Sequence, residues 1–232
     1  MTTLGIDTSA RVCSVALMVD GVPVSEKTLS DGLTHSETLL PSVDFVLKDG
    51  KMTIEDLDLI GVSVGPGSFT GLRIGISTVK GLAIARMIPC VGVSTLEALA
   101  KNAEHREGKT VCPVMDARRG EFYNALFFVQ NGDLVRLTPD RAISGEEIAK
   151  EMRGKDVLIL GDGAEKFVLL FPDFRDCLAP EEIRYQSGAS VARVAEGCAL
   201  TQGTSSPEAL FPKYLRMPQA EREWRKKFDT NQ

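Results

Sequence analysis

The chain opens with TTLGIDTS, residues 2–9, an apolar stretch of strand length that ends in Asp7 and a polar turn. Residues 12–19 follow with alternating apolar side chains, the pattern of a strand that buries one face. Asp20-Gly21 supplies a two-residue turn that tolerates positive φ, and residues 22–29 return as a third strand. The opening of the sequence therefore predicts a three-stranded meander.

The same plan recurs about a hundred residues later. Residues 111–115 form a predicted strand that ends in Asp116, and Asn131-Gly132 supplies the matching hairpin turn. The strand-ending aspartates are 109 positions apart and the two turns 111 positions apart. Residues 157–160 then run into a glycine loop at residues 161–164, as an earlier strand does. The repeat predicts a duplicated α/β lobe, although two unrelated hairpins in one chain would look the same.

The composition limits the classes of protein to which the chain can belong. Its 232 residues are 43% apolar and 25% charged, which excludes wholesale disorder. With 27 basic and 32 acidic residues the net charge is −5, so the basic surplus of a duplex-binding protein is missing. The five cysteines are scattered without C-x-x-C spacing, a pattern typical of a reducing compartment. We expect a cytoplasmic protein with no membrane span and no signal peptide.

The stretch richest in glycine is GPGSFTGLRIG, residues 65–75, which follows an apolar strand predicted at 57–64. Its spacing matches neither a dinucleotide-binding fingerprint nor a Walker loop. Ser68 can cap a helix that extends to about residue 86. On that helix a stripe at spacings of three and four has small residues at one end, and it consists of Gly71, Gly75, Thr78, Leu82 and Ala85.

This small-residue stripe needs a packing partner. Glycine destabilises a helix by ~1 kcal/mol per position relative to alanine, so the stripe is expected to allow close approach of another element. That element is either the helix predicted near residues 36–48 or another subunit, and the sequence leaves both open.

Signatures of catalysis are missing from the sequence. It contains no G-x-S-x-G motif, and neither of its two histidines lies near a cysteine or serine constellation. His35 could begin an H-x-x-x-H metal pair, but position 39 is Leu39. We therefore expect no catalytic residue and no metal ligand.

Two strand-ending aspartates are the best candidates for binding a small ligand. Asp7 and Asp116 each precede a tight turn, and two such turns across a cleft could hold the phosphates and Mg²⁺ of a nucleotide. The residues expected to face such a nucleotide are Asp7, Ser9, Asp116, Arg118, Gly161 and Gly163. Equally, both aspartates could simply start turns. No intrinsic cofactor is predicted, and ATP with Mg²⁺ is retained only as an alternative or as a ligand of a complex.

Six ordered motifs resemble the TsaB family, formerly called YeaZ. They are residues 5–9 (GIDTS), 65–75 (GPGSFTGLRIG), 80–83 (KGLA), 92–98 (GVSTLEA), 116–121 (DARRGE) with Tyr123, and Pro212 with Tyr214-Leu215-Arg216. The resemblance implies a duplicated two-lobed fold of the actin/sugar-kinase/Hsp70 type, with ribonuclease H-like mixed sheets flanked by helices. Residues 1–107 would form the first lobe, completed by residues 206–232, and residues 108–205 the second.

The resemblance also implies a role in making threonylcarbamoyladenosine beside the tRNA anticodon. The TsaB-like protein would be the non-catalytic partner of a related TsaD-like subunit, joined by a TsaE-like ATPase, with tRNA reached only through the complex. Contact with the TsaD-like subunit would use the first two helices, and a homodimer is expected when the chain is alone. The expected interface residues are His35, Ser36, Leu39, Leu40, Val43, Gly71, Arg73, Ile74, Gly75, Thr78 and Leu82.

Two other functions remain as alternatives. An ATP-dependent small-molecule kinase would use the two aspartate turns and the loop at residues 161–164. A glycoprotease-like metallopeptidase would need a metal set that the sequence does not supply.

Overall fold

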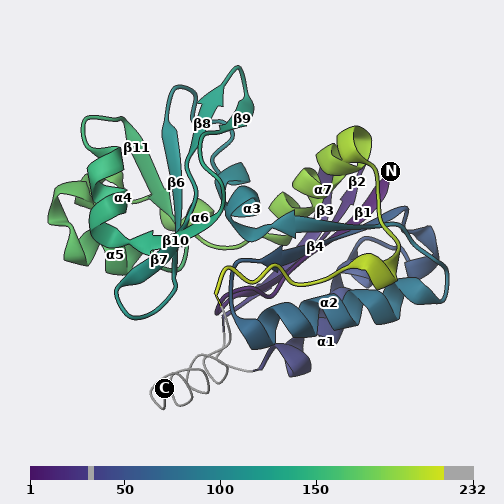
Figure 1. The fold of residues 1–232 in the computed structure, drawn as a ribbon. Helices are drawn as coiled ribbons and strands as arrows, with labels where there is room; N and C mark the ends of the chain where they lie inside the picture. Colours follow the sequence, from purple (N-terminus) through teal and green to yellow (C-terminus); the bar gives the residue numbers. More distant parts are fainter. Residues whose placement is uncertain (31–33, 217–232) are drawn as a thin grey trace, which may run out of the picture.

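The first half of the chain builds a five-stranded mixed sheet (Figure 1). The computed structural model describes residues 1–30 and 34–216. In this sheet the order is β3-β2-β1-β4-β5, and β1 pairs antiparallel with β2 and parallel with β4. The strands are β1 (Thr2–Asp7), β2 (Cys13–Val19), β3 (Val22–Leu29), β4 (Leu59–Gly65) and β5 (Cys90–Ser94). The predicted meander is confirmed, and its turn has positive φ at both Asp20 (49°) and Gly21 (78°).

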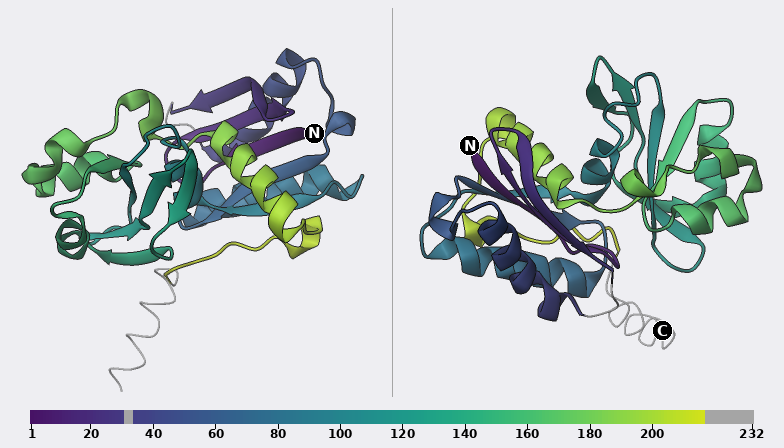
Figure 2. Two further views of the ribbon diagram at one scale, coloured as in Figure 1. Left: turned by 90° about the horizontal axis from the view of Figure 1, so that it is seen from above. Right: turned by 180° about the vertical axis from the view of Figure 1, so that it is seen from behind.

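Helices cover both faces of the first sheet (Figure 2). Helices α1 (His35–Asp49) and α2 (Phe69–Ile84) pack on one face, where their apolar sides join the core of β1, β2 and β4. Helix α7 (Gly188–Gln202) packs on the opposite face against β1, β2, β4 and β5. The first sheet is therefore buried on both sides.

Glycines in the sheet let α7 lie directly on the strands. A Cβ built on Gly5 would lie 2.1 Å from the carbonyl oxygen of Gly188, and one on Gly61 would lie 2.6 Å from Cβ of Ala195. The predicted boundary at residue 205 placed α7 in the second lobe, and the structure corrects this assignment. The alanine and valine side of α7 would suit either sheet, so only the three-dimensional packing distinguishes them.

Residues 205–214 also pack on the first lobe. Ser205 pairs with Cys90 as an isolated antiparallel bridge, and Leu210 lies in the core beneath α2. The rest of the predicted completing segment, residues 217–232, lies outside the described residues.

The second sheet repeats the pairing of the first. β6 pairs antiparallel with β7 at one end and with β8 at the other, while β11 pairs with it in parallel. Together β7 and β8 therefore take the position of β2, and β11 takes that of β4. The strands are β6 (Thr110–Asp116), β7 (Glu121–Asn124), β8 (Phe127–Gln130), β9 (Asp133–Arg136), β10 (Arg141–Ser144) and β11 (Val157–Leu160).

Four helices flank the second sheet. On one side α4 (Gly145–Met152) and α5 (Ala164–Leu170) enclose an aromatic core around Phe167. On the other side lie α3 (Thr95–Lys101) and α6 (Glu181–Arg184). Since α3 also contacts α7, it lies between the lobes. Within the described residues, no helix has the length and apolar composition that crossing a bilayer requires.

Replacing Gly5 by alanine is expected to lower the free energy of unfolding by about 2–3 kcal/mol, because the added methyl group would overpack against backbone. Urea denaturation followed by circular dichroism measures this change. Gly197→Ala is the matched control, since a Cβ on this exposed glycine of α7 meets no atom within 4 Å. The control should be unchanged or up to ~1 kcal/mol more stable. Equal stability of Gly5→Ala and the wild type would contradict the packing of α7 on β1.

Candidate functional site

Asp7 lies at the carboxyl end of β1, inside the first lobe. Its side chain is fully buried, and Oδ1 accepts hydrogen bonds from the backbone N and the Oγ of Ser9 at 2.8 and 2.7 Å. Ser63 Oγ donates to the other carboxylate oxygen. Burial raises the pKa of Asp7, and these hydrogen bonds oppose the shift. In this conformation the carboxyl group is held by its own lobe rather than presented to a ligand.

The turn after β1 is filled by the glycine-rich loop that precedes α2. Ser68 N donates to the carbonyl oxygen of Ser9 at 2.7 Å, and a Cβ on Gly67 would lie 2.4 Å from that same oxygen. Gly67 is therefore explained by close packing of two backbones. The segment GPGS occupies the place where Ser9 was expected to face a phosphate.

Asp116, the matching aspartate of the second lobe, is exposed. Lys166 Nζ lies 2.9 Å from each of its carboxylate oxygens, and Arg118 N donates to Oδ1 at 2.8 Å. The residue thus both starts the β6–β7 turn and neutralises a lysine of α5. The side chain of Arg118 itself is exposed at this turn.

The loop at residues 161–163 packs against β6. A Cβ on Gly161 would lie 2.3 Å from the carbonyl oxygen of Val114, and one on Gly163 would lie 2.8 Å from the backbone N of Asp116. Both glycines are required by this backbone contact. Between them, Asp162 has a buried Oδ1 without a hydrogen-bond partner.

Asp162 lies close enough to two other aspartates to be affected by their charges. Burial, then the charge of Asp116 and, more weakly, that of Asp7, raise the pKa of Asp162 to about 6, while Arg11 opposes the shift. Among the described residues, no group of three or more His, Cys, Asp or Glu side chains could hold a metal ion. The expectation that these residues face a nucleotide remains a prediction.

The two glycines of the α2 stripe, Gly71 and Gly75, face the chain's own first lobe. A Cβ on Gly71 would lie 2.0 Å from the carbonyl oxygen of Thr8, and one on Gly75 would lie 2.4 Å from Thr8 Oγ1. Thr8 Oγ1 in turn donates to the carbonyl oxygen of Gly71 at 2.8 Å. The stripe was expected to pack against either its own chain or another subunit. Its two glycines pack against Thr8 of their own chain.

Four of the predicted interface residues are therefore corrected. Gly71 and Gly75 meet Thr8, and Leu39 and Val43 are buried in the core of the first lobe. His35 is half-buried, with Nε2 2.7 Å from the carbonyl oxygen of Ala10. Helical periodicity identifies a buried side but does not say what covers it, and here the sheet and the β1–β2 turn cover it.

The outward face of α1 and α2 retains part of the predicted interface. Ser36, Leu40 and Arg73 are exposed, whereas Ile74, Thr78 and Leu82 are half-buried. Phe45, Gly81 and Ile84 of the same two helices are also exposed and were not among the predicted interface residues. A Cβ on Gly81 would meet no atom within 4 Å. The signal that could have drawn attention to Gly81 is a glycine inside a predicted helix.

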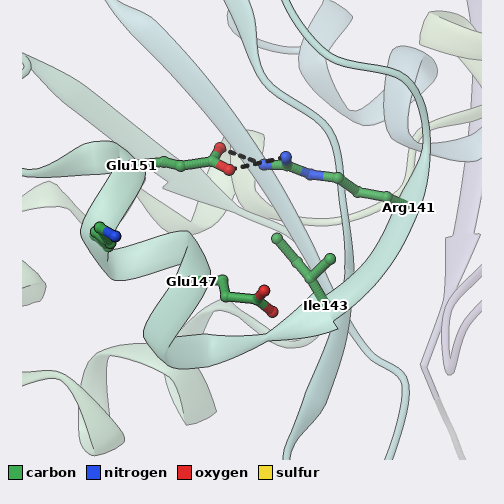
Figure 3. A pocket seen from close by; sticks show the side chains of 5 residues that line it. Arg141, Ile143, Glu147 and Glu151 are labelled. Atoms are coloured by element: carbon green, nitrogen blue, oxygen red, sulfur yellow. Dashed lines mark hydrogen bonds and ion pairs between the residues drawn. The ribbon is translucent and has the colours of Figure 1, made fainter.

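A shallow pocket on the second lobe contains none of the predicted site residues (Figure 3). Arg141 and Glu151 form a bidentate ion pair across it, and Arg141 also donates to Oδ1 of Asn124. Glu147 accepts hydrogen bonds from the backbone N and the hydroxyl of Ser144, the N-cap residue of α4, and so completes a capping box. Three of the charged groups that line the pocket, those of Arg141, Glu147 and Glu151, thus serve local structure.

Comparisons with known proteins agree on one family. A sequence model of the family "TsaD: tRNA N6-adenosine threonylcarbamoyltransferase" matches residues 32–224. The chain is 33% identical over 232 residues to the tRNA threonylcarbamoyladenosine biosynthesis protein TsaB of Bacillus subtilis, covering 97% of this chain and 98% of that protein. It is 40% identical over 124 residues to the protein of the same name from Escherichia coli, covering 53% of each.

A solved structure is similar to this chain in both fold and sequence. YeaZ from Pseudomonas aeruginosa superposes with a TM-score of 0.78 at 28% identity, covering 92% of this chain and 99% of that chain. The predicted two-lobed actin-like fold is confirmed by this match. The predicted resemblance to the TsaB family is confirmed as well.

Asp162→Asn is expected to stabilise the protein at neutral pH but not in acid. Because the pKa of Asp162 is raised from 3.8 to about 6, the folded state favours the neutral carboxyl group. Its stabilisation is fully present below about pH 4 and is lost as the pH rises through 6. The neutral amide should therefore raise the free energy of unfolding by roughly 1–3 kcal/mol at pH 7.5.

Urea unfolding between pH 4 and 8 measures this difference, which should shrink with falling pH and vanish near pH 4. Asp133→Asn, at an exposed aspartate of β9, is the control and should show no pH-dependent gain. A difference that is constant across the pH range would contradict the assigned cause.

Proposed function

The chain belongs to the TsaB family, whose members take part in threonylcarbamoyladenosine modification of tRNA, and we propose that it acts as a non-catalytic scaffold that binds a TsaD-like catalytic subunit. The outward face of α1 and α2 is the docking surface. Its central feature is Gly81, an exposed helical glycine whose built Cβ meets no atom of residues 1–30 and 34–216 within 4 Å.

Gly81 supports the proposal because its own lobe gives no reason for it. Glycine within a helix is less favourable than alanine by ~1 kcal/mol, and a Cβ here would have free space. A second helix that crosses α2 closely at this point would account for the missing side chain. Gly71 and Gly75 allow close packing inside the lobe, whereas Gly81 leaves space on its outer surface.

Apolar side chains are also exposed on these two helices. Leu40 of α1 is 53% exposed and Ile84 of α2 is 52% exposed. Phe45 of α1 is also exposed, with Lys27 Nζ 4.6 Å from its ring centroid. Burying these side chains against a partner would release the free energy of apolar surface held in water. In the absence of the partner the same face pairs with a second copy.

The interior of the lobe supports a non-catalytic role. Leu39 stands where an H-x-x-x-H metal pair would need its second histidine, and it is buried at 1% exposure. Asp7 is hydrogen-bonded within its own lobe. The chain therefore contributes shape and contact surface, while the TsaD-like subunit contributes the transferase site and a TsaE-like ATPase joins the pair. With a net charge of −5 the chain meets tRNA only through the complex.

Gly81→Leu is expected to weaken binding of the TsaD-like subunit from the same organism at least tenfold, because the added side chain would stand in the path of the partner helix. Isothermal titration calorimetry measures the affinity, and gel filtration shows whether the mixed complex survives. The fold should be unharmed, since leucine is a better helix former than glycine and has free space at this position.

Gly197→Leu is the matched control. It places the same side chain on an exposed helical glycine with free space, but on α7, and should bind like the wild type. Gly75 is unsuitable for this test because a Cβ there would strike Thr8 Oγ1 at 2.4 Å and disturb the lobe itself. Equal affinity of the two leucine variants would refute the docking face, and turnover of ATP by the isolated chain would favour a kinase instead.

A further inference from the structure

The end of the described chain runs along α2 towards the second lobe (Figure 1). Lys213 N donates to the carbonyl oxygen of Val64 at 2.7 Å, at the end of β4. Gly65 makes this approach possible, because a Cβ there would lie 2.5 Å from the carbonyl oxygen of Lys213. The segment is thus fixed to the first lobe by its backbone.

Tyr214 attaches the same segment to the first turn of α2. Its ring stacks on Phe69 with centroids 4.0 Å apart and planes 16° apart. Arg73 Nε donates to the Tyr214 hydroxyl at 2.8 Å, and its guanidinium lies 5.8 Å from the tyrosine ring centroid. Stacking and a cation over the ring each stabilise such a contact beyond simple burial.

Arg216 makes its contacts in the other lobe. Nη1 donates to the carbonyl oxygen of Ala117 at 2.7 Å, and the guanidinium forms an ion pair with Glu121. Only 15% of the Arg216 side chain is exposed, so its charge has left most of its water and depends on these partners. Both partners belong to the β6–β7 turn, in which Arg118 and Arg119 have positive φ of 65° and 56°.

The two covalent crossings between the lobes meet at a different point. One crossing follows α3 and the other links α6 to α7. Asn102 joins them, because its Nδ2 donates to the carbonyl oxygens of Ile183 and Tyr185 at 3.0 and 2.7 Å. Ser190 Oγ then donates to Asn102 Oδ1 at 2.6 Å. Two crossings that meet at one residue form a hinge, about which the lobes can turn unless a second attachment holds them.

We propose that residues 212–216 are a non-covalent latch that limits rotation of the second lobe about the hinge at Asn102. The segment is anchored on the first lobe by Lys213 and Tyr214, and it grips the β6–β7 turn through Arg216. Loss of the Arg216 contacts frees the second lobe while both lobes stay folded. Tyr214 links the latch to Phe69 and Arg73, so the position of the second lobe also affects the first turn of α2.

Arg216→Ala in the otherwise full chain tests the latch without any partner, so its outcome is independent of the proposed function. Nitroxide labels at Val22→Cys in the first lobe and Leu169→Cys in the second, with Cys177 and Cys198 changed to serine, report the distance between the lobes. The distance distribution should broaden in Arg216→Ala. Amide exchange at residues 117–121 should become at least about fivefold faster, while exchange in β1 and β4 stays unchanged.

Lys213→Ala is the matched control, because it removes the same charge from the same segment but leaves the backbone hydrogen bond to Val64 in place. It should resemble the wild type in both measurements. Glu121→Gln, which weakens the same ion pair from the second lobe, should broaden the distances as Arg216→Ala does. Faster exchange at residues 117–121 with an unchanged distance distribution would reduce Arg216 to a local contact and overturn the latch.

Discussion

The contact between the β1–β2 turn and the start of α2 determines what this protein can offer to other molecules. Thr8 lies against Gly71 and Gly75, and the carbonyl oxygen of Ser9 accepts a hydrogen bond from the backbone N of Ser68. Backbones at this separation leave no room for a Cβ, so the glycine side of α2 must face inward. The opposite side, with Arg73 and Gly81, is then exposed, and it is the proposed docking surface. A single close contact inside the lobe thus sets the direction of the outer surface.

The same contact accounts for the state of the first aspartate. Loop and turn close over the end of β1, which leaves Asp7 without water and dependent on Ser9 and Ser63 for hydrogen bonds. In the second lobe the corresponding loop at residues 161–163 packs against β6, but the matching Asp116 stays exposed and paired with Lys166. Two aspartates at equivalent positions of a duplicated fold therefore have different environments. Duplication preserved the strand plan but not the chemistry at the strand ends.

Local chemistry made part of this fold predictable from sequence. Asp20-Gly21 and Asn131-Gly132 adopt the positive φ that their residue types favour, so both hairpins could be placed. The exposed side of α2 could not be predicted, because the sequence pattern of the stripe is the same whether it packs on a turn of its own chain or on another subunit. For the same reason the sequence could not place α7 on the first sheet. These choices depend on contacts between residues more than 60 positions apart, such as Thr8 with Gly71, to which no local pattern responds.

Tyr214 and Arg73 connect the two surfaces that the chain offers. Arg73 lies on the outward face of α2 and holds the hydroxyl of Tyr214, two residues before the Arg216 that grips the second lobe. If a partner that contacts Arg73 strengthens this arrangement, thermodynamic linkage requires that lobe closure strengthen binding of the partner by the same factor. In this way the proposed scaffold would couple its two surfaces, because the position of its second lobe affects the first turn of α2. Such coupling needs no ligand between the lobes, only a hinge at Asn102 and one segment that touches both sides.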